Sequence, residues 1–185
     1  MSKVLVLSAV ALVVAAVLGT ATDGVAASSD GSVESHCVIG VVDQLQDGAL
    51  VFGAPRCYPT LGAAIIDATD GKLRIPAQFS GADLFAGSST DESLLSSFAL
   101  GIHFDGFNGS GSSITVVGSS CTGGWWNTGA TWRNRISSSW NGCYRLQHHD
   151  KPNRAGITES TTGSGRVHNL SVLNNKAESI SYWSG

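Results

Sequence analysis

The sequence predicts an all-β protein, and three observations support that prediction. A pattern of six positions between residues 103 and 118 recurs between residues 148 and 163, and five of the six residues are identical. Short runs of β-branched and aromatic residues, such as residues 114–117 and Ser179–Trp183, are typical of strands. Gly, Ser and Asn are frequent between these runs, as expected for antiparallel strands joined by tight turns.

The internal repeat defines the folding unit of the C-terminal half. In the first pattern the residues are His103, Phe104, Asp105, Asn108, Gly111 and Gly118, answered by His148, His149, Asp150, Asn153, Gly156 and Gly163. A second pattern, residues 133–138, is answered by residues 174–179. Each copy has about 45 residues, too few to bury a core alone, so we expect two copies to pack together.

The first 27 residues predict export. Lys3 precedes an apolar run over residues 4–18, and small residues follow as far as Ala27, where cleavage is expected. The run of about 15 residues is shorter than the roughly 20 that span a bilayer, which favours a signal peptide at residues 1–27 over a membrane anchor. We therefore expect a secreted, extracellular protein that has no membrane association after cleavage.

The charge balance argues against nucleic acid as a partner. Cleavage after Ala27 would remove one basic residue, Lys3, and one acidic residue, Asp23, from the 11 and 14 of the whole chain, so the net charge stays at -3. Such a chain has no obvious basic face for phosphates. Its C-terminal half is locally basic, which leaves an anionic cell-wall polymer as an alternative partner.

Four cysteines in an exported chain are expected to form disulfides. Of the three possible connectivities we favour Cys37 with Cys57 and Cys121 with Cys143. Each bond would close a loop of about 20 residues and add roughly 3 kcal/mol of stability. Metal–thiolate ligation is the alternative, but the sequence lacks the Cys-x-x-Cys spacing that such sites use.

Residues 28–97 are expected to form a small N-terminal subdomain and a linker. Residues 38–42 and 50–52 are rich in β-formers and flank a turn, which predicts a hairpin closed by the first disulfide. Thr60 is expected to cap a helix that ends near Ala68. Gly, Ser and Asp dominate residues 80–97, which we interpret as a mobile linker or an irregular packing arm. The second domain covers residues 98–185.

Two residue types in the repeat suggest folded-back hairpins. Gly111 and Gly156 occupy equivalent places after a bend, where a positive φ is required. A buried hydroxyl can hold such a hairpin against its sheet, and Ser138 and Ser179 are the candidates.

These residues resemble the βγ-crystallin family. Its Greek-key motif runs aromatic, four residues, aromatic, one residue, Gly, and here it appears at 104–111 and 149–156. A second signature of two Asn/Asp, two free positions and two hydroxyl residues appears at 133–138 and 174–179. Gly109 and Arg154 replace the second aromatic residue, and His149 replaces the first one in the second copy. In the second signature, Arg133 replaces the first Asn/Asp and Glu178 replaces the first hydroxyl residue. The resemblance implies a two-motif Greek-key sandwich over about residues 100–185.

The resemblance also implies calcium sites in which each copy lends ligands to the other. The first site would use the carbonyls of Asp105 and Arg135, the hydroxyl of Ser137 and the side chain of Asn175. The second would use the carbonyls of Asp150 and Lys176, the carboxylate of Glu178 and the side chain of Asn134. Oxygen ligands suit calcium, and the low ligand charge predicts weak affinity. The alternative is a metal-free motif in which Asn and Ser satisfy the turn backbone.

The histidines and tryptophans leave further alternatives open. His148 and His149 are adjacent on an expected strand and point to opposite faces, so they cannot chelate one ion. No catalytic motif is present, and we do not expect an enzyme. Trp125 and Trp126 either form an aromatic platform for sugar or protein, or close the core of the first copy.

The function expected from the sequence is that of a non-enzymatic extracellular module with calcium as its one candidate cofactor. The first alternative is an inhibitor of secreted proteases, because a secreted bacterial metalloproteinase inhibitor family has the same type of sandwich. A toxin or a protein that binds cell-wall carbohydrate is the third interpretation.

Overall fold

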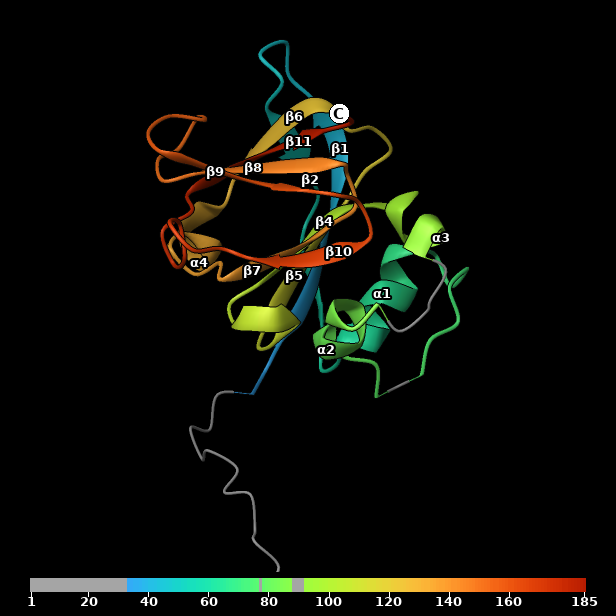
Figure 1. Cartoon of the computed structure of the whole chain (residues 1–185). Helices are drawn as coiled ribbons and strands as arrows, with labels where there is room; N and C mark the ends of the chain where they lie inside the picture. Colours follow the sequence, from blue (N-terminus) through green and yellow to red (C-terminus); the bar gives the residue numbers. More distant parts are fainter. Residues whose placement is uncertain (1–32, 77, 88–91) are drawn as a thin grey trace, which may run out of the picture. The chain divides into compact units, whose positions relative to one another are not determined.

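The computed structural model describes residues 33–76, 78–87 and 92–185 (Figure 1). The expected signal peptide at residues 1–27 lies outside these ranges. Within them, the regular secondary structure is mostly β-strands in two sheets, accompanied by a few short helices, which confirms the all-β prediction. No helix in the described ranges is long and apolar enough to cross a bilayer.

The elements follow one another closely along the chain. The strands are β1 (His36–Gln44), β2 (Leu50–Phe52), β3 (Arg56–Tyr58), β4 (Ala99–Phe104), β5 (Ser113–Val117), β6 (Thr122–Asn127), β7 (Ser138–Asn141), β8 (Arg145–His149), β9 (Thr158–Thr162), β10 (Arg166–Asn169) and β11 (Ser179–Trp183). The α-helices are α1 (Leu61–Ala68), α2 (Gly81–Phe85), α3 (Glu92–Ser96) and α4 (Gly129–Trp132), and η1 (Phe107–Gly109) is a single 3-10 turn.

Four neighbouring strands of the first sheet have the same order as the four strands of the second sheet when the two copies of the repeat are compared. The first sheet runs β10-β7-β4-β5-β1-β2, with β3 also paired to β1, and the second runs β6-β11-β8-β9. β1 and β5 are parallel, whereas the other paired strands are antiparallel. Figure 1 shows β6, β8, β9 and β11 as one layer and β4, β5, β7 and β10 as another.

The sequence repeat is visible in this strand order. The first copy supplies β4 to β7 and the second supplies β8 to β11. In each copy the first, second and fourth strands are neighbours in one sheet, whereas the third strand pairs with the fourth strand of the other copy. Each half therefore completes the sheet of the other half, which agrees with the expectation that the two copies pack together.

The apolar core lies between the sheets. Strand alternation turns Ile180 and Tyr182 of β11 inward, where they join Leu146 of β8 and Val116 of β5, all fully buried. A second apolar cluster covers the other face of the first sheet, where Leu61 and other residues of the helical segment meet residues of β4 and β7. Figure 1 shows α1, α2 and α3 gathered at this side.

The segment preceding β4 is part of the first sheet. The predicted hairpin is β1 with β2, and β1 also lies parallel to β5, so residues on both sides of the expected boundary at 97 share one sheet. The predicted helix is α1, and the Thr60 hydroxyl accepts the amide of Ala63 at its N-terminus. In the expected linker, Leu84 of α2 and Leu95 of α3 are buried, so it packs through helices that the sequence pattern missed.

Both predicted disulfides are confirmed. Cys37 bonds to Cys57 and Cys121 bonds to Cys143, and no free cysteine is present among the described residues. The first bond ties β1 to β3, and the second anchors the chain before β6 to the turn after β7.

Candidate functional site

The turns that follow β4 and β8 have the same construction. Gly111 and Gly156 have φ values of 77° and 82°, which glycine adopts at little cost. A Cβ at either position would meet the side chain of the aspartate that opens its turn, Asp105 or Asp150. The predicted role of these two glycines is confirmed.

A serine holds each folded turn against its sheet. The Ser138 hydroxyl donates to the carbonyl of Gly106 at 2.7 Å and accepts the amide of Gly109 at 3.1 Å. In the second copy, Ser179 donates to the carbonyl of Lys151 at 2.7 Å and accepts the amide of Arg154 at 3.0 Å. The hydroxyl role predicted for Ser138 and Ser179 is therefore confirmed.

Asparagines close each turn from the opposite copy. Asn169, at the end of β10, accepts the amide of Asn108 at 2.7 Å and donates its side-chain nitrogen to the Asn108 side chain at 2.6 Å. Asn127, at the end of β6, makes the same two bonds with Asn153, both at 2.8 Å. Sequence reasoning missed Asn127 and Asn169, although their spacing of 42 residues is close to that of the repeat.

The first expected calcium site brings three of its four expected ligand groups into contact. The Ser137 hydroxyl lies 2.8 Å from the Asp105 carbonyl oxygen and 3.1 Å from Oδ1 of Asn175. The guanidinium of Arg135, whose carbonyl is the fourth expected ligand, binds Oδ2 of Asp105 at 2.7 Å. It also lies 5.0 Å from the ring of Trp132.

The second expected site brings two of its side chains together. Nδ2 of Asn134 lies 3.4 Å from Oε1 of Glu178, and Nε of Arg133 lies 3.5 Å from Oε2 of the same carboxylate. The backbone amide of Glu178 donates to the carbonyl of His149, the neighbour of Asp150. The carboxylate of Asp150 instead accepts the amide of Ile157 at 2.7 Å. Lys176 makes a local backbone bond to Leu173.

The oxygen atoms of the first site fit a hard cation better than those of the second. The Ser137 hydroxyl has one proton and faces two acceptors, so it can donate to only one of them at a time. Three oxygens thus meet with a single proton between them, and oxygen ligands are those that calcium uses. In the second site, Asn134 presents its nitrogen and Arg133 already neutralises Glu178.

Four polar side chains form a connected network inside the core. Nε2 of His103 lies 3.0 Å from the Tyr182 hydroxyl, and Nδ1 of His103 lies 2.8 Å from Oγ of Ser139. The same Oγ lies 2.9 Å from Nε2 of His148, and all four residues have no exposed surface. Nδ1 of His148 has no hydrogen-bond partner among the described residues.

The environment of this network keeps both imidazoles neutral. Burial lowers the pKa of His103 well below its ordinary value, and the neighbouring His148 lowers it further. Burial likewise lowers the pKa of His148 to about 4, against a smaller opposing effect of the Glu159 carboxylate. His149 points the other way, toward Ser181 at 3.3 Å, so the prediction that the adjacent histidines face opposite sides is confirmed.

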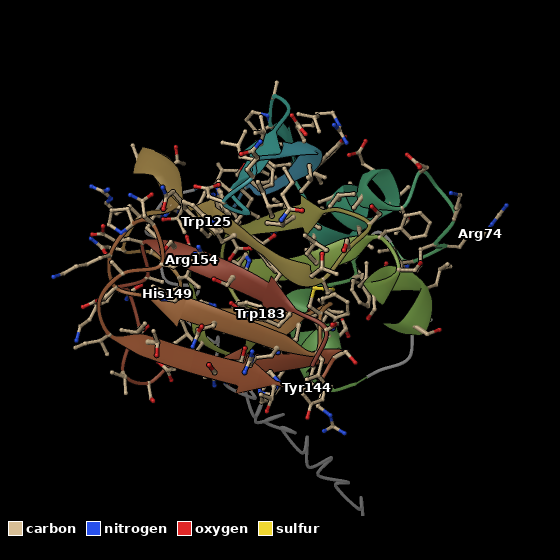
Figure 2. The ribbon with its side chains drawn as sticks, turned by 90° about the horizontal axis from the view of Figure 1, so that it is seen from above. Arg74, Trp125, Tyr144, His149, Arg154 and Trp183 are labelled. Carbon is tan, nitrogen blue, oxygen red and sulfur yellow. A yellow bond between two sulfur atoms is a disulfide. The ribbon has the colours of Figure 1, made fainter. Side chains whose placement is uncertain are left out.

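Trp125 and Trp126 pack as part of the folded structure. Trp126 faces the core between the sheets with 8% of its surface exposed, and Trp125 faces outward but retains only 6%. Figure 2 shows Arg154 beside Trp125, and its guanidinium lies 5.3 Å from the ring centre. Nε1 of Trp125 donates to the carbonyl of Asp47 at 3.2 Å. These contacts leave little of the Trp125 ring for a sugar or protein ligand.

The departures from the aromatic motif have local structural reasons. Gly109 lies against Gly81 at the start of α2, where any Cβ would overlap the opposing backbone. An aromatic side chain at residue 109 would therefore displace α2. Arg154, at the equivalent place in the second copy, extends over Trp125 instead.

Comparison of the chain with protein-family models, curated proteins and solved structures gave no match.

Proposed function

We propose that this chain is a secreted, non-enzymatic module of the βγ-crystallin type, whose two sheets form a two-motif Greek-key sandwich stabilised by calcium. The exchange of third strands between the copies supports the Greek-key interpretation. The reciprocal Asn and Ser bonds at the turns support it independently. Two disulfides agree with an oxidising, extracellular-type environment.

The contact of Ser137 with Asp105 and Asn175 is the observation that supports calcium. The Asp105 carbonyl and Asn175 Oδ1 both face the single proton of the Ser137 hydroxyl. A cation bound by these three oxygens and the Arg135 carbonyl would interact favourably with all of them at once. It would also join the two copies, because Asn175 belongs to the second copy and the other ligands belong to the first. The calcium would act as a hard cation that cross-links the turns, and we expect affinity at the weak end, about 0.1 to 1 mM.

A non-enzymatic role is supported by the state of the histidines. His103 and His148, the most conspicuous titratable pair, are completely buried and bonded to Ser139 in the core. A group with no exposed surface cannot reach a substrate unless the sheets separate. Their contacts are those of a structural network.

The test compares thermal unfolding of the mature protein in about 10 mM calcium with unfolding in a chelator. We expect calcium to raise the melting temperature and magnesium to have a smaller effect, because magnesium requires a tighter octahedral site. Asn175→Gly should abolish the calcium response, since it keeps a residue that tolerates the left-handed backbone while removing Oδ1.

Asn153→Gly is the matched control. Asn153 has a similar φ of 59° but lies outside both expected ligand sets, so its variant should respond to calcium as the parent does. An unchanged melting temperature of the parent in calcium, or a full response by Asn175→Gly, would disprove the proposed site.

A further inference from the structure

An apolar pocket of about 270 Å³ opens at one rim of the core between the two sheets. Its walls come from β1, β2 and β5 of the first sheet, and from β6 and α4 on the other side. Three aromatic side chains, Phe52, Trp126 and Trp132, contribute to the lining, and no charged residue is among the described residues that form it.

The walls of this pocket are held by contacts that do not depend on an occupant. The disulfide between Cys37 and Cys57 ties β1 to β3 at one side. Phe52 packs edge-on against Trp126 with ring centres 6.0 Å apart. On the opposite side, the Arg135 guanidinium lies 5.0 Å from the Trp132 ring and binds Asp105. The walls therefore resist collapse, and an apolar molecule between them would gain dispersion contacts.

Two threonine hydroxyls lie at the pocket, and they differ in whether they can donate a hydrogen bond to a ligand. Thr128 is buried, and its hydroxyl already donates to the carbonyl of Glu178 at 3.1 Å. Thr131 is exposed at the rim, where its hydroxyl can donate to an entering molecule. An ionised ligand would lose its hydration here without gaining a partner charge, so the lining selects neutral compounds.

We propose that this pocket binds a small, neutral, fused two-ring aromatic compound. An apolar cavity of about 150 Å³ suffices for benzene, so 270 Å³ accommodates a second ring. The aromatic walls favour edge-to-face contact with a planar ligand. One hydrogen-bond acceptor on the ligand, directed to the rim, would meet Thr131. This inference does not depend on calcium binding.

Coumarin, a neutral two-ring compound with one carbonyl, is the probe for the test. Titration of the mature protein by calorimetry or saturation-transfer NMR should give one site with a dissociation constant on the order of 100 µM. The indole N–H signals of Trp126 and Trp132 should shift on binding, and those of Trp140 and Trp183 should not. Coumarin-3-carboxylate, the charged analogue, should bind at least about tenfold more weakly.

Thr131→Trp should fill the pocket from its exposed rim and weaken coumarin binding at least about tenfold. Thr162→Trp on β9, also exposed, is the matched control and should bind coumarin like the parent. The NMR shifts of the parent give an answer even if Thr131→Trp does not fold. The proposal is overturned by absence of binding up to about 1 mM coumarin, by shifts confined to other tryptophans, or by equal affinity for the charged analogue.

Discussion

Asn134 and Asn175 occupy equivalent left-handed positions, and each sends its backbone N–H into the other half of the repeat. Their φ values are 57° and 54°. The amide of Asn134 donates to the carbonyl of Ala177 at 3.0 Å, and the amide of Asn175 donates to the carbonyl of Ile136 at 2.9 Å. The reciprocal pair links the two copies through the backbone, whatever the side chains bind.

Replacing either asparagine with alanine should reduce the free energy of unfolding by about 1 to 2 kcal/mol. Alanine pays a steric cost in the left-handed conformation, whereas glycine does not. The Ala and Gly variants lose the same side-chain contact, so their difference in urea midpoint isolates the backbone requirement. Equal midpoints for Asn134→Ala and Asn134→Gly would show that the left-handed backbone is not the reason for asparagine at this position.

Local patterns in the sequence were enough to predict some of the local elements, although they missed the helices α2 and α3. The cap at Thr60, the strand Ser179–Trp183 and the turn positions Gly111 and Gly156 depend on neighbouring residues, and the structure has all of them. The repeat added long-range information, because two copies of one pattern indicate equivalent places in a fold. It correctly predicted that the Ser138 hydroxyl holds the folded turn of the first copy against its sheet.

Contacts between distant residues outside the repeat could not be predicted in this way. The parallel pairing of β1 with β5 leaves no signal in either strand, since any β-rich segment could fill that edge. The bond of Arg135 to Asp105 and the place of Ser139 between two histidines also depend on the folded arrangement. The candidate ligands were named through a family resemblance, and the ion pair of Arg133 with the Glu178 carboxylate became visible only in three dimensions.

The contact between Gly81 and Gly109 yields a steric prediction. A Cβ on Gly81 would overlap the carbonyl group of Gly109, and neither backbone can move without shifting α2 or η1. Gly81→Ala should therefore cost about 2 to 3 kcal/mol of unfolding free energy, measured by urea denaturation.

The matched control for this contact is Gly40→Ala in β1, where a Cβ would have no neighbour within 4 Å. Its stability should stay within about 0.5 kcal/mol of the parent or rise slightly. If Gly81→Ala is as stable as Gly40→Ala, α2 does not pack closely on η1 in solution.

The buried histidines predict a loss of stability in mild acid. Folding lowers the pKa of His148 from 6.5 to about 4, so below pH 6.5 the unfolded chain binds a proton that the folded chain excludes. The neutral imidazole contributes fully to the free energy of unfolding above pH 6.5, and this contribution is lost as the pH falls toward 4. Between pH 6.5 and about 5 we expect a decrease on the order of 2 kcal/mol from His148, with a further decrease from His103.

His148→Gln tests whether this residue causes the decrease. Glutamine does not titrate, so the variant should be less stable than the parent near neutral pH, where the parent's network is intact, but should lose less stability on acidification. Urea midpoints measured between about pH 7.5 and 5 give the change of stability with pH. This interval lies above the pH range in which carboxylates ordinarily titrate. A variant with the parent's slope would exclude His148 as the source, because the proton uptake that drives the loss would then persist without its imidazole.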